Sequence, residues 1–113
     1  MITVADQRRE LLAMGREGHV AAFVDRACTM AAADLADVLG ALPAATCASL
    51  LPRLPARVAA QALIALPRER PPARLLASIA PEHAAQMIAE LEDDDAADLL
   101  GALPLGPRQL ILE

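Results

Sequence analysis

The sequence has almost no aromatic residues. Aromatics make up 1% of its 113 residues, Phe23 is the single ring, and tryptophan, tyrosine and lysine are absent. Strands favour aromatic and β-branched side chains, whereas alanine, which is abundant here, is the best helix former. A core of small aliphatic side chains also requires its elements to approach closely, which helices can do. The composition therefore predicts an all-α protein.

The sequence also lacks a long hydrophobic run. Hydrophobic residues make up 56% of the chain, but Pro, Arg, Asp or Glu interrupts each apolar stretch. A membrane-spanning helix needs about 20 consecutive apolar residues. The first residues do not show the basic region followed by an apolar region that is typical of a signal peptide. We therefore expect a cytoplasmic chain that does not itself insert into a membrane.

Residues that carry catalytic or metal chemistry are few and isolated. Cys28 and Cys47 are too few for a disulfide framework, and we expect both to be unbridged and buried as small hydrophobes. His19 and His83 have no companion at metal-ligand spacing. No nucleophile–base grouping or glycine-rich phosphate loop can be assembled. We predict that the chain is not an enzyme.

The net charge of −5 is unevenly distributed. Residues 1–81 carry nine Arg against seven acidic residues, whereas residues 82–113 carry eight acidic residues against Arg108 alone. Nucleic-acid binding needs a positive surface and gains from aromatic stacking, so we expect no nucleic-acid partner. The acidic end favours a cation or a basic partner. Five arginines in the middle of the chain are expected to form a solvated face, and docking of an acidic partner there is left open. These are Arg53, Arg57, Arg68, Arg70 and Arg74.

Apolar runs close at intervals of 12 or 13 residues, and proline follows most of them. The closing residues are Leu42, Leu54, Leu66, Ile79, Leu91 and Leu103. Within residues 95–103 the apolar positions are i, i+3, i+4 and i+7, which form one helical face. Proline disfavours helical backbone in the preceding residue and suits the first turn of a following helix. A helix that fits within a repeat of 12 or 13 residues is too short to be stable alone. The pattern therefore predicts a superhelical stack, or solenoid, of about eight short helices.

The length of the chain fits one core, so residues 1–113 are predicted to form a single helical-repeat domain. Residues 105–113 are expected to start a connecting helix or linker. Near the beginning, residues 8–15 read as a helix that ends at Gly15, a candidate C-terminal cap. Pro52 is expected to shorten or kink its helix.

Two segments carry a resemblance to a known family. Residues 33–43 read ADLADVLGALP, and residues 91–104 read LEDDDAADLLGALP. With the repeated Leu-Pro punctuation, they resemble the intracellular N-terminal domain of MgtE-type magnesium transporters. The recurrent phrase of that family is Asp-Pro-Asp-Asp-Ala-Ala-Asp-Leu-Leu. The sequence keeps this phrase over residues 94–100 and has Asp93 in place of its proline.

The resemblance implies a regulatory domain with partners in the same transporter. In the family, cystathionine-β-synthase-type domains and a dimeric membrane channel follow this domain. Magnesium bound between the N domain and those neighbours favours a closed channel. By resemblance, we expect Mg²⁺ as a weakly bound ligand whose site a partner domain completes. We also expect a position at the cytosolic face of the inner membrane and a homodimer formed through the full-length protein.

Asp94, Asp95 and Asp98 are the predicted metal ligands. Asp94 and Asp98 share one face if the segment is helical, and Mg²⁺ prefers oxygen ligands while keeping several waters, so these residues make half of a site. Two alternatives stay open. The acidic residues can stabilise the start of a helix, with Asp93 as its N-cap. The whole domain can also be a metal-independent scaffold for protein–protein interaction, either free-standing or similar to the flagellar motor switch protein.

Overall fold

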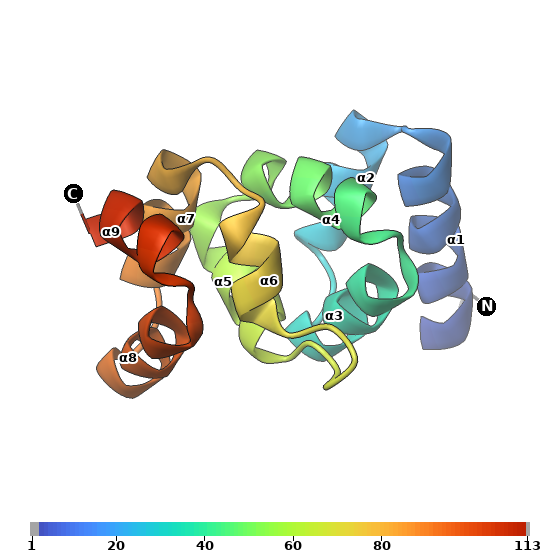
Figure 1. The fold of residues 1–113 in the computed structure, drawn as a ribbon. Coiled ribbons are helices and arrows are strands. Elements are labelled where there is room, and N and C mark those ends of the chain that lie inside the picture. The colour runs from blue at the N-terminus through green and yellow to red at the C-terminus, as the bar shows by residue number, and fades with distance from the viewer. Residues whose placement is uncertain (1–2, 113) are drawn as a thin grey trace.

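The computed structural model describes residues 3–112 and shows an elongated stack of short helices, 46 × 25 × 24 Å in extent. The first and last helices lie at opposite ends of the stack (Figure 1). Residues 3–112 contain nine α-helices, one 3₁₀ helix and no strand, so the all-α prediction is confirmed. The α-helices are α1 (Val4–Glu17), α2 (Val20–Ala27), α3 (Ala32–Ala41), α4 (Ala44–Leu50), α5 (Ala56–Ile64), α6 (Pro72–Ala77), α7 (Pro81–Ala89), α8 (Asp93–Ala102) and α9 (Leu105–Leu112), and the 3₁₀ helix is η1 (Leu51–Arg53).

The helices form two rows. The odd-numbered helices α1, α3, α5, α7 and α9 contact one another in succession, and α4, α6 and α8 form a second row in the same way. Helix α2 packs against α1, and η1 joins α4 to α5. Figure 1 shows the order of the chain running along the stack from α1 to α9. Each helix therefore buries its apolar face against helices that lie close to it in sequence, as the repeat predicts.

Proline ends and starts these helices as the sequence predicts. Leu42 and Leu54 precede prolines and have extended backbone, with ψ angles of 153° and 152°. Pro43 and Pro55 are then the N-cap residues of α4 and α5. The closing leucines turn their side chains into the core: Leu42 is 1% exposed and Leu54 5%. Pro52 lies in η1, so the expected interruption of its helix is confirmed.

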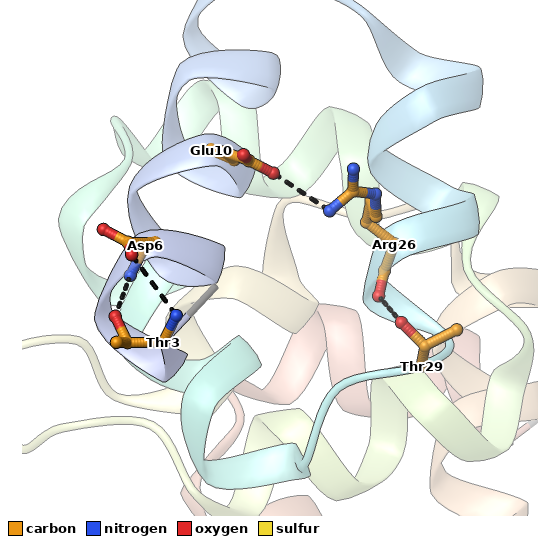
Figure 2. A network of polar contacts seen from close by, with 5 residues as sticks. All are labelled: Thr3, Asp6, Glu10, Arg26 and Thr29. Atoms are coloured by element: carbon orange, nitrogen blue, oxygen red, sulfur yellow. Dashed lines mark hydrogen bonds and ion pairs between the residues drawn. The ribbon is translucent and has the colours of Figure 1, made fainter. Parts of the chain in front are cut away.

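The first helix is longer than the sequence analysis predicts. The Thr3 side chain accepts a hydrogen bond from the backbone N–H of Asp6, and the Asp6 carboxylate accepts one from the backbone N–H of Thr3 (Figure 2). This capping box starts α1 four residues early. Gly15 does not end the helix; Gly18 does, with a left-handed φ of 76°. Gly15 is buried in the middle of the packing and leaves room for Leu42. A Cβ at Gly15 would lie only 2.8 Å from a methyl carbon of Leu42.

A polar contact and an apolar contact hold α2 against α1. Arg26 on α2 donates a hydrogen bond to Glu10 on α1 at 3.0 Å, and the Thr29 hydroxyl donates to the Arg26 carbonyl (Figure 2). On the inner side of α2, Phe23 and Ala27 are fully buried. The ion pair is half exposed, so most of the stabilisation comes from the apolar side.

The core is entirely apolar. Among residues 3–112 no polar or charged residue is buried. The largest fully buried side chains are Phe23, Leu11, Leu35, Leu39, Leu42, Leu51, Leu63, Leu76 and Cys47. Any binding chemistry of this part of the chain therefore lies at its surface. The predicted limits of the domain and the predicted connecting role of residues 105–113 stay predictions; α9 covers Leu105–Leu112, and Glu113 lies outside the described residues.

Candidate functional site

The acidic residues of the predicted site lie at the beginning of α8. Glu92, not Asp93, is the N-cap residue, with extended backbone at φ −65° and ψ 155°. No side chain makes a capping hydrogen bond there, so the predicted capping role of Asp93 is wrong. Asp93, Asp94 and Asp95 occupy the first turn, where negative charge complements the helix dipole. Helix stabilisation therefore accounts for part of this charge.

The packing of α8 decides which acidic residues face the solvent. Leu99 is buried and Ala96 half-buried, and both belong to the apolar core. Asp94 and Asp98 are exposed and lie one helical turn apart, whereas Asp95 is half-buried. We refer to Asp94, Asp95 and Asp98 together as the acidic face. The structure thus brings the three predicted ligands onto the same two turns of one helix.

Among residues 3–112, no cation is paired with the acidic face. The ion pairs formed by residues 3–112 involve α1, α2 and α3 and the turn after α1, and none includes a residue of α8. The related segment of α3 differs, because its Asp37 pairs with Arg8 at 2.9 Å. Two carboxylates about 6 Å apart in water repel each other by about 0.7 kcal/mol. Because the carboxylates of the acidic face repel one another and have no cationic partner within residues 3–112, a cation from solvent or from another domain would stabilise them.

The donor set fits only part of a magnesium shell. Carboxylate oxygens are suitable ligands, and Glu92, Asp93 and Asp94 line a shallow depression beside the acidic face. Within residues 3–112, however, no group of three or more His, Cys, Asp or Glu side chains is placed to hold a metal ion by itself. Water and groups from another domain would have to supply the remaining ligands.

Arg70 has a structural role that the sequence analysis missed. Its Nη1 donates to the carbonyl oxygens of Leu39, at 2.6 Å, and of Leu42, and lies 3.2 Å from the Cys47 sulfur. These two carbonyls lie at the end of α3, where a helix leaves its last acceptors unpaired. Arg70 is half-buried, so the predicted solvated role is wrong for it. No sequence signal indicates the contact, because the partners are 31 and 28 residues away.

The other four arginines of that segment are exposed, as predicted. They are Arg53, Arg57, Arg68 and Arg74.

The two cysteines differ in exposure, although both are free thiols. Cys47 is fully buried as predicted, and its thiol donates to the Leu39 carbonyl at 2.9 Å. Burial raises the pKa of the Cys47 thiol, and the nearby Arg70 charge only partly opposes this. Cys28 is exposed, so its predicted burial is wrong. It is the C-cap residue of α2, one position after the buried Ala27.

This difference predicts unequal thiol reactivity. At neutral pH, we expect Cys28 to react quickly with a thiol reagent and Cys47 to react only through opening of the fold, because a buried neutral thiol is a poor nucleophile. The measurement is the number and rate of labelled thiols in native buffer and in denaturant. Cys28→Ser is the control variant, in which the fast phase should disappear. Fast native labelling of that variant would contradict the burial of Cys47.

The fold and the surface define a class of protein. Two rows of short, proline-punctuated helices with an acidic face near one end make a helical-repeat domain. None of its helices within residues 3–112 has the length and hydropathy needed to cross a membrane. The sequence matches the family described as the MgtE intracellular N domain over residues 30–113. The chain belongs to this family, and the match includes the acidic face.

A solved structure shares the fold. It is described as the crystal structure of the soluble part of a magnesium transporter, and it superposes with a TM-score of 0.79 at 21% sequence identity. The match covers 97% of this chain and 43% of that chain, so the present chain spans less than half of the solved protein. No match was found among curated proteins. At this identity, the likeness establishes a common architecture.

Proposed function

We propose that this chain is a non-catalytic regulatory domain of a magnesium transporter, which senses Mg²⁺ through the acidic face on α8. The observation that carries the proposal is the exposure of Asp94 and Asp98, with no cation paired to either within the described residues, inside the region that matches the MgtE N domain family. Carboxylates in this setting suit a hard divalent cation. The solved relative, described as part of a magnesium transporter, supports the choice of metal.

The acidic face works as one half of a switch in this proposal. Residues 82–98 carry seven acidic residues and no Arg, so an acidic partner surface would be repelled when the metal is scarce. Mg²⁺ shared between the two surfaces replaces this repulsion with attraction. Metal then favours the docked state because it binds that state more tightly than the free one. The fold of this domain need not change.

The partner in this proposal lies elsewhere in the same transporter. By family resemblance, it is a cystathionine-β-synthase-type domain that stands between this domain and the membrane channel. Docking at high Mg²⁺ would favour the closed channel, and release at low Mg²⁺ would allow opening. The domain would act at the cytosolic face of the membrane.

The first test uses the isolated chain. We expect weak, millimolar Mg²⁺ binding, because two or three carboxylates cannot complete the preferred shell of the ion. In an amide NMR titration, the largest saturable shifts should fall on residues 92–98. Asp94→Asn with Asp98→Asn should abolish these shifts, yet change the free energy of unfolding by no more than about 1 kcal/mol, because Asp94 interacts with the dipole of α8 and Asp98 is exposed. The control is Asp25→Asn, which removes an exposed acid from α2 and should leave binding unchanged.

The second test uses a transporter that contains this domain. Proteolysis of the linker after the domain should slow as Mg²⁺ rises, because docking covers the linker. The double variant should need more Mg²⁺ for the same protection. Identical protection curves for wild type and variant would reject the acidic face as the sensor and favour a metal-independent scaffold.

A further inference from the structure

A cavity of about 420 Å³ lies between α4 and α6, and its charged lining residues are two arginines and one glutamate. Arg70 and Arg74 border the cavity, with Ala44 at the start of α4 on the other side. Neither arginine takes part in an ion pair with another residue in the described part of the chain. Two guanidinium groups without an ion-pair partner favour an anion at this cavity, although the Glu69 carboxylate also lines it.

Arg70 presents a free edge that is held in place. A guanidinium has five N–H donors, and the contacts to the α3 carbonyls and to Cys47 all come from Nη1. Nε and Nη2 have no hydrogen-bond partner among residues 3–112. Solvent reaches both nitrogens. Within residues 3–112, a side-chain nitrogen that is buried and has no hydrogen-bond partner occurs at Nε of Arg108 and not at Arg70. The parallel N–H groups of Nε and Nη2 match the two oxygens of a carboxylate or phosphate.

The Nη1 contacts also make this edge ready for binding. A flexible arginine loses side-chain entropy when it binds a ligand, but the α3 carbonyls already fix the position of Arg70. Arg74 is exposed and lies four residues further along the chain, on α6, where it adds a second positive charge to the cavity. Glu69 also lines the cavity and opposes an anion, although its exposed carboxylate can turn towards solvent.

We propose that this cavity binds an oxyanion, either a carboxylate or a phosphate group, through the free edge of Arg70 and the charge of Arg74. The site is formed by other residues than the magnesium face and takes a ligand of opposite charge. A negative result at this site would therefore leave the proposed magnesium sensing unaffected, and a negative result for magnesium would leave this site unaffected.

The test follows the Nε–H resonances of the arginines in ¹⁵N-labelled chain. The probes are sodium phosphate and sodium acetate, each compared with sodium chloride at equal ionic strength. We expect a saturable shift of the Arg70 Nε–H with at least one probe. A response to phosphate alone supports a phosphate ligand, and a response to acetate supports a carboxylate ligand such as an acidic side chain of a partner.

Matched variants distinguish this site from general charge attraction. Arg74→Ala should weaken the affinity about five- to tenfold, whereas Arg57→Ala, which removes an equal exposed charge from α5, should leave it unchanged. Glu69→Gln should strengthen binding, because it removes the opposing carboxylate. The proposal is overturned if neither probe gives a saturable shift, or if Arg57→Ala weakens binding as much as Arg74→Ala.

Discussion

Phe23→Ala is expected to lower the free energy of unfolding by about 3–5 kcal/mol. Phe23 is fully buried and is the largest side chain in the core. Its ring packs against α1 at Gly15, where an added Cβ would lie 3.4 Å from a ring carbon. The remaining core side chains are smaller than a phenyl ring and cannot collapse far enough to fill the space. Domains of this size are commonly stable by about 5–15 kcal/mol, so the loss is a large fraction of the total.

The measurement is urea denaturation followed by circular dichroism, with the slope of the transition compared between variants. Ile64→Ala is the matched control, because Ile64 is 50% exposed and its truncation leaves little cavity. We expect that variant to lose about 1 kcal/mol or less. Equal losses for the two variants would show that the aromatic ring is not the centre of the α1–α2 packing.

Arg70→Met is expected to lower the free energy of unfolding by about 1.5–3 kcal/mol, the usual range for hydrogen bonds from a charged group. Met keeps much of the apolar stem but removes the donors that satisfy the carbonyls at the end of α3. A cation at the C-terminus of a helix also interacts favourably with its dipole. The substitution therefore removes a tie between the α5–α6 loop and α3.

Two further variants show whether the hydrogen bonds cause the effect. Arg70→Lys should recover part of the lost stability, because an ammonium can donate to the same carbonyls but lacks the planar fork. Arg57→Met removes an exposed arginine and should change stability by no more than about 0.5 kcal/mol. If Arg70→Met and Arg57→Met had the same stability, the contact to α3 would contribute nothing measurable.

The architecture could be predicted because its causes are local. Proline acts on the residue before it, so the ends of α3, η1 and α8 follow from the Leu-Pro pairs alone. The i, i+3, i+4, i+7 spacing likewise decides which side of α8 is buried. Since each helix packs on helices nearby in sequence, the local pattern also indicates the stack.

The errors arise where one residue type suits two environments. Gly15 and Gly18 both suit a helix end in sequence, but only Gly18 has the left-handed backbone, and Gly15 makes room for Leu42. Cys28 and Cys47 are chemically identical, but Cys28 follows the end of α2 and is exposed, whereas Cys47 lies within α4 and is buried. Such choices depend on tertiary packing, which a single sequence does not display.

The candidate sites show the same division. Asp94, Asp95 and Asp98 could be placed together from sequence because they occupy adjacent turns of one helix. The contact of Arg70 with α3 could not, because it joins a loop to carbonyl groups that every residue possesses. The sequence of a segment does not indicate which of its backbone carbonyls accepts a hydrogen bond from a distant side chain.

The row-by-row stacking has a consequence for how the molecule opens. Among residues 3–112, α8 and α9 lie at one end of the stack and have neighbours on one side, whereas α3 and α5 are held from both sides. In such one-dimensional assemblies, terminal repeats can unfold without the rest, and amide hydrogen exchange is fastest there. Within the part of the chain that the structure describes, the carboxylates of α8 therefore belong to one of the two end units, which open more cheaply than the middle of the stack. A ligand that bridges this helix to a neighbouring domain would supply the missing flank and slow exchange across α8 and α9 first.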